Sequence, residues 1–110
     1  MPDYTQSKIY LIRNFENDFV FVGATTQRLS KRWGSYKENW KKDKMGSLYD
    51  AFNDVGYEQF YIELYKNVNC KNIEELRKHQ ADIIRLYNNK AYNTILSRAR
   101  TLIENLKIND

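Results

Sequence analysis

The stretch that most constrains the fold runs from residue 8 to residue 36, because it joins two strand-like segments to a helix. Residues 8–13 and 19–23 are rich in β-branched and aromatic side chains, and a polar segment separates them. This pattern is typical of a β-hairpin. A two-residue turn at Glu16 and Asn17 would place Tyr10 opposite Gly23, whereas a longer turn would shift the pairing by one residue.

The hairpin leads into a helix that carries both aromatic and basic side chains. A hydroxyl group of Thr25 or Thr26 is expected to cap its first turn, because it can accept from the unpaired N–H groups there. Part of the aromatic series is expected in the core, since its members recur at helical spacing. These members are Leu29, Trp33, Tyr36 and Trp40.

The rest of the chain predicts a third strand and three more helices. Residues 47–55 form an amphipathic helix, with a capping-box-like pair at Ser47 and Asp50 and a stop at Gly56. Residues 59–65 alternate in polarity, as a half-buried strand does. Residues 72–88 form a long helix opened by Asn72, and residues 94–107 form a basic last helix. The predicted order of elements is therefore β-β-α-α-β-α-α.

One polar side chain interrupts the apolar stripe of the long helix. Gln80 follows Leu76 by four residues and precedes Ile83 by three. A polar group at such a position needs a hydrogen-bonding partner. Gln80 is either a partly exposed residue bonded to a neighbouring backbone group or a site residue that faces the sheet. The pattern alone favours the first interpretation.

Positive charge is concentrated in one window of the chain. The formal net charge is +4, and residues 28–44 alone hold seven basic and two acidic side chains. Basic groups beside aromatic rings suit a nucleic-acid surface, and a solvated basic helix is the alternative. The basic residues of this window are Arg28, Lys31, Arg32, Lys37, Lys41, Lys42 and Lys44. A second patch contains Arg98 and Arg100, with Arg85 and Lys90 nearby.

Composition excludes several classes of protein. The 110 residues predict a single domain, 1–110. The single cysteine, Cys70, excludes an internal disulfide and a cysteine-rich zinc site, and it fits a reducing compartment. The single histidine, His79, excludes a histidine-rich metal centre. No apolar run approaches the roughly 20 residues that cross a bilayer, and no signal peptide is present. We therefore expect a soluble intracellular protein of the cytoplasm or nucleus, without a membrane partner.

Common catalytic signatures are absent from the sequence. It has neither the Gly-x-x-x-x-Gly-Lys-Ser/Thr loop nor the Gly-x-Gly-x-x-Gly pattern, and a lone histidine argues against a Ser-His-Asp triad. Phosphate chemistry would instead need a cation on the phosphate, a general base and usually a metal held by a carboxylate. Arg32 and Tyr10 are candidates for the first two roles. The alternatives are a surface arginine and a tyrosine that packs on a sheet.

Four segments, taken in order, resemble the GIY-YIG nuclease family. Residues 8–10 (Lys-Ile-Tyr) stand at the place of the first motif, and residues 21–23 (Phe-Val-Gly) stand at the place of the second. Residues 23–36 resemble the family's Gly-x-Thr…Leu-x-x-Arg-x-x-x-His/Tyr segment. Residues 75–84 resemble its catalytic-glutamate helix, and Asn93 falls where the family places an asparagine. The resemblance covers residues 8–93.

The resemblance implies an α+β fold, with a three-stranded antiparallel sheet flanked by helices, and cleavage of phosphodiester bonds with one metal ion. Tyr10 would activate or orient water, and Arg32 would stabilise charge on the pentacovalent phosphate. Tyr36 would assist at the phosphate or in proton transfer, and Asn93 would support the site. The position of the family's metal-binding glutamate, which holds Mg²⁺ or Mn²⁺, is Gln80 in this chain.

Two positions depart from the family's pattern. Phe21 replaces the tyrosine of the second motif and lacks its hydroxyl group, on which some members rely for proton transfer. Gln80 keeps the shape of glutamate without its charge. A unit charge at 4 Å is worth about 4 kcal/mol at an effective dielectric constant near 20, so Gln80 should bind Mg²⁺ poorly. Glu74 and Glu75 lie more than one turn away and are not expected to replace it.

The sequence therefore predicts a metal-dependent DNA endonuclease domain whose activity is weak or absent. Its expected partner is double-stranded or branched DNA, and RNA is a further candidate. The alternative is a nuclease-derived module that binds nucleic acid without cleaving it. A protein-interaction domain that uses exposed tyrosines is a less favoured third hypothesis.

Overall fold

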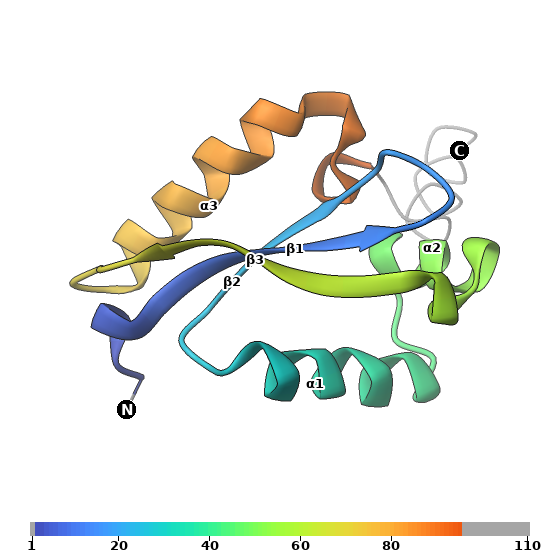
Figure 1. The fold of residues 1–110 in the computed structure, drawn as a ribbon, viewed down its shortest axis with the longest axis horizontal. Coiled ribbons are helices and arrows are strands. Elements are labelled where there is room, and N and C mark those ends of the chain that lie inside the picture. Colours follow the sequence, from blue (N-terminus) through green and yellow to red (C-terminus); the bar gives the residue numbers. More distant parts are fainter. Residues whose placement is uncertain (1, 96–110) are drawn as a thin grey trace, which may run out of the picture.

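The computed structural model describes residues 2–95, which form a three-stranded antiparallel sheet between two layers of helix (Figure 1). Strand β1 (Ser7–Asn14) is central, with β2 (Phe21–Thr25) on one side and β3 (Phe60–Val68) on the other. Ile9, Tyr10, Leu11 and Ile12 are each at most 1% exposed, because helices cover both faces of this strand. The predicted α+β fold with a three-stranded antiparallel sheet is confirmed.

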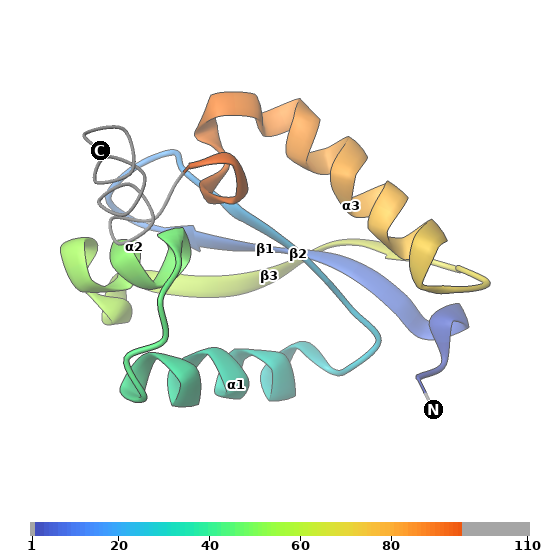
Figure 2. The ribbon, with the colours of Figure 1, turned by 180° about the vertical axis from the view of Figure 1, so that it is seen from behind.

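Helices of different character cover the two faces of the sheet (Figures 1 and 2). Helices α1 (Leu29–Lys41) and α2 (Ser47–Val55) pack on one face, and α3 (Ile73–Tyr87) packs on the other. The last helix predicted from the sequence, 94–107, lies almost entirely outside the described residues. No helix within residues 2–95 combines the length and the hydropathy needed to cross a membrane.

The hairpin has the register that a two-residue turn at Glu16 and Asn17 would give, with Tyr10 opposite Gly23. Its connecting loop is nevertheless longer than two residues, since β1 ends at Asn14 and β2 begins at Phe21. The Asn14 carboxamide oxygen accepts two backbone N–H groups of this loop, at 2.8 and 2.9 Å. The side chain of Asn14 thus shapes the loop without changing the pairing that precedes it.

Helix caps were predicted correctly at one helix and wrongly at two. The side chain of Asn72 accepts from the N–H of Glu75 at 3.0 Å, as expected for α3. At α1 the threonine cap is wrong: β2 extends through Thr25, whose hydroxyl accepts from Gln27 N–H before the helix begins. At α2 the capping box is wrong, because the hydroxyl of Ser47 donates to the backbone of a distant residue.

The buried side chains form two separate clusters, one on each face of the sheet. The cluster beneath α1 and α2, called the aromatic core below, has as its buried members Tyr10, Ile12, Tyr36, Leu48, Ala51, Phe52, Phe60 and Tyr92. The cluster beneath α3, called the aliphatic core, has as its buried members Ile9, Leu11, Val20, Val22, Val68, Cys70 and Leu76. Alternation along β1 sends neighbouring side chains to opposite clusters.

Candidate active site

Tyr10 is positioned by β1 and by the absence of a side chain on the neighbouring strand. A Cβ atom added to Gly23 would lie 2.0 Å from Cζ and 2.4 Å from the hydroxyl oxygen of Tyr10. The tyrosine ring therefore lies directly over the Gly23 backbone, and only glycine leaves room for it. Size, rather than backbone conformation, explains the glycine of the second motif here.

Tyr36 reaches the hydroxyl group of Tyr10 from helix α1. The two hydroxyl oxygens are 2.7 Å apart, and Tyr36 is only 5% exposed. The ring of Tyr36 packs edge-on against those of Tyr10 and Phe21, with centroids 6.4 and 6.0 Å away. Phe21 thus contributes a ring to the wall of the site, without a hydrogen-bonding group of its own.

Arg32 lies one helical turn before Tyr36 and covers the tyrosine pair. Its Nε donates to the hydroxyl of Tyr10 at 3.1 Å, and Nη2 lies 3.5 Å from that of Tyr36. Its guanidinium carbon is 4.8 Å from the centroid of the Tyr36 ring, within the range of a cation–π contact. Within residues 2–95, no carboxylate forms an ion pair with Arg32. The site therefore presents a partly exposed cation fixed by two hydroxyl groups.

Burial and neighbouring groups shift the pKa values of Tyr36 and Arg32. Burial raises the pKa of Tyr36, and the adjacent Tyr10 raises it further, while Arg32 opposes the change. Tyr36 therefore keeps its proton and can donate it in the hydrogen bond to Tyr10. Burial alone would lower the pKa of Arg32, but the hydrogen bond to Tyr10 and the tyrosine oxygens outweigh it and raise that pKa. The Tyr10 oxygen accepts from Arg32 Nε, and either hydroxyl group can be the donor in the bond between the two tyrosines.

Gln80 and Asn93 meet at the outer edge of β2 rather than at Arg32. The Asn93 amide donates to the Val22 carbonyl at 2.8 Å, and its oxygen accepts from the Val22 N–H at 2.9 Å. The Gln80 amide donates to the same carbonyl at 3.0 Å. Val22 directly precedes Gly23, over which Tyr10 lies. The pair of Gln80 and Asn93 and the group around Tyr10 therefore contact neighbouring residues of β2. Gln80 is partly exposed and bonded to a backbone group, as in the first interpretation, but that group belongs to the sheet, which the second interpretation expects Gln80 to face.

The residues at the Gln80 position do not fit a divalent metal. Mg²⁺ prefers carboxylate oxygens, whereas Gln80 is neutral and points its N–H toward a carbonyl. Within residues 2–95, no group of three His, Cys, Asp or Glu side chains is placed to hold a metal ion. Glu75 is engaged elsewhere, since its carboxylate accepts from Lys71 N–H at the start of α3. The arrangement forms an amide clamp on the sheet edge instead of a metal site.

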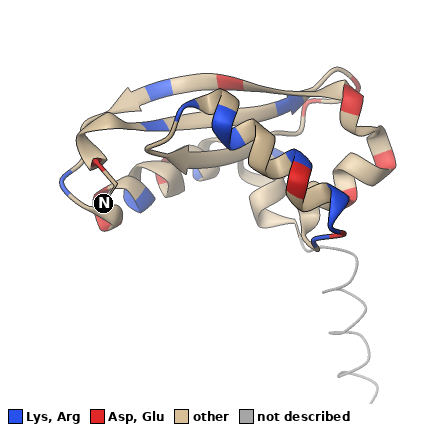
Figure 3. Cartoon of the chain, turned by 90° about the horizontal axis from the view of Figure 1, so that it is seen from below, with Lys and Arg blue, Asp and Glu red and all other residues tan. Residues whose placement is uncertain are grey.

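The predicted basic surface lies along and just beyond α1. The six side chains expected there besides Arg32 are all exposed: Arg28, Lys31, Lys37, Lys41, Lys42 and Lys44. In the second predicted patch, Arg85 pairs with Asp82 and Lys90 lies 3.7 Å from Asp18. Arg98 and Arg100 lie outside the described residues. Basic positions also occur on the strands of the sheet (Figure 3).

The architecture resembles a solved nuclease domain. The catalytic domain of the homing endonuclease I-TevI superposes with a TM-score of 0.66 and 22% sequence identity, over 78% of this chain and 95% of that one. The fold is therefore the GIY-YIG fold. No protein-family model and no curated protein matches the sequence. At this identity the similarity establishes the fold, and the chemistry rests on the residues described above.

Sequence reasoning missed one participant in the candidate site. The backbone of Val22 is the common partner of Gln80 and Asn93, and only the three-dimensional arrangement reveals this. Lys8 lies outside this hydrogen-bonded group: its ammonium group donates to the backbone carbonyls of Gln6, just before β1, and Gln27, just before α1.

Proposed function

We propose that the chain is a DNA-processing domain built on the GIY-YIG nuclease fold, which binds a backbone phosphate at Arg32. The observation that carries this proposal is the cation itself: Arg32 is fixed by two tyrosine hydroxyl groups and is not neutralised by a described carboxylate. Guanidinium groups bind phosphate oxygens through parallel N–H donors. The fold similarity to a homing endonuclease catalytic domain supports double-stranded or branched DNA as the partner.

The three residues can divide the work of phosphodiester cleavage among them. Arg32 would stabilise the negative charge that develops on the phosphate, since fixed donors aimed at such charge contribute strongly to catalysis. Tyr36 retains its proton and keeps the Tyr10 hydroxyl in place. The Tyr10 hydroxyl group, held by Arg32 and Tyr36, would orient an attacking water molecule. A divalent metal, when bound in such enzymes, supplies Lewis-acid activation.

The proposed endonuclease activity is weak or absent in this chain because the metal position is occupied by an amide. A second candidate function is binding of DNA or RNA without cleavage. The hydrogen bond from Gln80 to the Val22 carbonyl favours it, since it commits this side chain to the sheet edge. Both functions use the same phosphate-binding residues, and they differ only in whether the phosphodiester bond is then cleaved.

Nicking of supercoiled plasmid distinguishes the two functions. The unaltered chain and its Gln80→Glu variant are compared in Mg²⁺ and in Mn²⁺, with the Gln80→Glu/Arg32→Ala double variant as the control. An endonuclease domain predicts metal-dependent nicking that Gln80→Glu gains and the double variant loses. If Gln80→Glu binds DNA but does not nick it in either metal, the binding function is supported instead. Absence of both binding and nicking would contradict the proposal.

A further inference from the structure

A second cation lies on the same face of β1 as Tyr10. Lys8 and Tyr10 are two residues apart on the strand and pair with Thr25 and Gly23 of β2, respectively. Side chains two residues apart in a strand share a face and are separated by roughly 6.6 Å along it. Lys8 is thus the next position on the face that carries the phosphate-binding group. It also occupies the place of the first motif's glycine.

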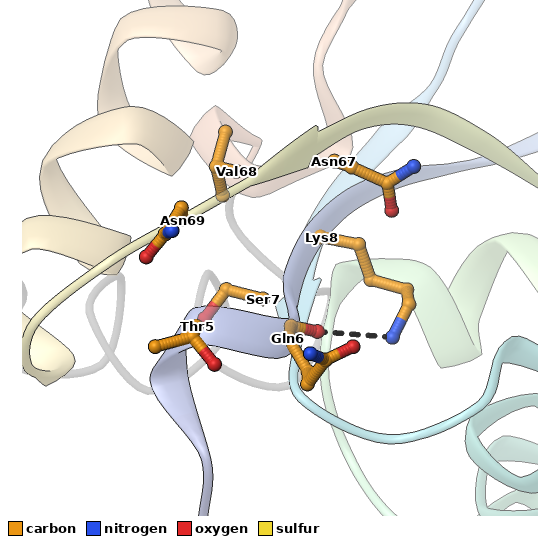
Figure 4. Close-up of a pocket in the computed structure, with 7 residues that line it drawn as sticks. All are labelled: Thr5, Gln6, Ser7, Lys8, Asn67, Val68 and Asn69. Atoms are coloured by element: carbon orange, nitrogen blue, oxygen red, sulfur yellow. Dashed lines mark hydrogen bonds between the residues drawn. The ribbon is translucent and has the colours of Figure 1, made fainter.

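The ammonium group of Lys8 is held in place by backbone oxygens. Its Nζ donates to the carbonyl of Gln27 at 3.0 Å and to that of Gln6 at 3.2 Å, and Figure 4 shows the second contact. Gln27 lies just before α1, the helix that carries Arg32. An ammonium group has three N–H donors, so one remains for a ligand. The lysine is therefore oriented before any ligand arrives.

The surroundings of Lys8 favour an anion. No carboxylate within residues 2–95 forms an ion pair with it. It lines a surface cavity of about 270 Å³ whose walls contain no acidic residue (Figure 4). Asn67, which pairs with Lys8 on β3, and Asn69 line the same cavity and add amide donors. A cation with a free donor, without a counterion, beside further donors is suited to bind phosphate oxygens.

We propose that Lys8 binds a second phosphate of the nucleic-acid backbone, next to the one at Arg32. The inference rests on the proposed function. It places two cations from one face of the sheet on successive phosphates of one nucleic-acid strand. A nucleic-acid backbone supplies regularly repeated anions, which a single small anion does not. The side chain would then have two roles, binding the phosphate and holding the segment that precedes α1.

The salt dependence of DNA affinity tests this inference. Each neutralised phosphate of double-stranded DNA contributes about −0.9 to the slope of log affinity against log salt concentration. Fluorescence anisotropy with a labelled duplex should show that Lys8→Gln weakens binding and makes the slope shallower by about 0.9, whereas Lys8→Arg keeps the slope. Lys78→Gln is the matched control, since Lys78 is exposed on α3, and it should change neither quantity.

The possible outcomes separate this inference from the function on which it rests. An unchanged slope for Lys8→Gln overturns the inference, as does weaker binding by both Lys8 variants with the slope preserved, because the lysine would then only hold the loop. A chain that shows no salt-dependent binding contradicts the proposed function and the inference with it. Acetylation of the unaltered chain gives a readout that needs no variant: DNA should protect Lys8 but not Lys78, and an unprotected Lys8 overturns the inference.

Discussion

The central strand β1 is buried on both faces of the sheet, but the two faces are chemically different. Beneath α3 the aliphatic core consists of branched aliphatic side chains and Cys70. Polar contacts link this helix to the sheet at two places: Gln80 donates to the edge of β2, and Tyr87 accepts from Arg13 of β1. Beneath α1 the aromatic core contains tyrosine hydroxyl groups that must be satisfied inside it. The hydroxyl groups of Tyr10 and Tyr36 are hydrogen-bonded to each other, and Arg32 donates a hydrogen bond to this pair. The comparison shows one face that supplies stability and another that supplies a site.

A single strand serves both faces because its side chains alternate. Ile9 and Leu11 enter the aliphatic core, whereas Tyr10 and Ile12 enter the aromatic core. Substitutions of the buried side chains of the aliphatic core should therefore change stability alone, and substitutions that move Tyr10 or Arg32 should also change phosphate binding. Each prediction below tests this division, beginning with the largest expected effect.

Leu76→Ala should cause the largest loss of stability without affecting the site. Leu76 is 3% exposed in the aliphatic core, and truncation of a buried leucine costs about 2–5 kcal/mol of unfolding free energy. Denaturant titration measures this loss, and DNA affinity is then measured where the variant remains folded. The affinity should equal that of the unaltered chain. A parallel loss of affinity would show that the two faces are not independent.

Gly23→Ala should disturb the α1 face directly. The new methyl group would collide with the Tyr10 ring, and overpacking of this kind costs about 1–3 kcal/mol. Because Tyr10 must move away from Arg32, DNA affinity should fall as well. Gly34→Ala is the matched control: a Cβ there meets nothing within 4 Å, and alanine in a helix is more stable than glycine by about 0.5–1 kcal/mol. Equal effects of the two variants on binding would refute the close-packing explanation.

Gln80→Glu should destabilise the metal-free chain by about 1–3 kcal/mol at neutral pH, because a carboxylate replaces the donor to the Val22 carbonyl. Repulsion between the two oxygens raises the pKa of the introduced glutamate above its ordinary value. The variant should therefore lose stability as the pH rises through that pKa, and differ least from the unaltered chain in acid. Mg²⁺ should raise the melting temperature of the variant but not that of the unaltered chain. A metal response in the unaltered chain would contradict the amide-clamp description.

Tyr36→Phe should destabilise the fold, whereas Tyr57→Phe should not. Loss of the Tyr36 hydroxyl removes a buried hydrogen bond and should cost about 0.5–1.5 kcal/mol. Tyr57 is stacked between Trp33 and Trp40, and its buried hydroxyl has no hydrogen-bonding partner among the described residues. Its removal should be neutral or stabilising. Denaturant titration measures the unfolding free energy of both variants. It decides whether hydrogen-bonded hydroxyl groups distinguish the site from the rest of the aromatic core.

The raised pKa of Tyr36 adds a pH dependence to this comparison. A tyrosine that keeps its proton in the folded state favours folding fully below its unfolded pKa, near 10, and loses that contribution as the pH rises further. The unaltered chain should therefore lose more stability above pH 10 than Tyr36→Phe does. Identical alkaline unfolding profiles would show that this hydroxyl is not the buried, protonated partner of Tyr10.

Local chemistry made much of the fold predictable. The bounds of α2, the stop at Gly56 and the Asn72 cap depend on nearby residues, and the structure has all three. The sequence left the hairpin register open between two pairings, and the structure has the pairing of Tyr10 with Gly23 across a loop longer than two residues. The wrong caps at α1 and α2 have tertiary causes. Strand β2 continues through Thr25, and the hydroxyl of Ser47 bonds to Tyr92, 45 positions away.

The candidate site was likewise predictable from the sequence only in part. The resemblance indicated Tyr10, Arg32 and Tyr36, but only the structure shows that they form one hydrogen-bonded group. The partner of Gln80 lies 58 positions away on β2, so the sequence left its role open between two interpretations. Contacts of this kind depend on how the helices lie on the sheet, which periodicity does not specify.

DNA affinity of Arg32→Ala, measured at low salt beside Arg77→Ala, tests the central claim most directly. Both substitutions remove one positive charge, but Arg32 covers the tyrosine pair whereas Arg77 is exposed on α3. The phosphate-binding role predicts that Arg32→Ala loses at least tenfold in affinity, equivalent to about 1.4 kcal/mol, while Arg77→Ala stays close to the unaltered chain. Equal affinities for the two variants would contradict the assignment of the α1 face as the nucleic-acid site.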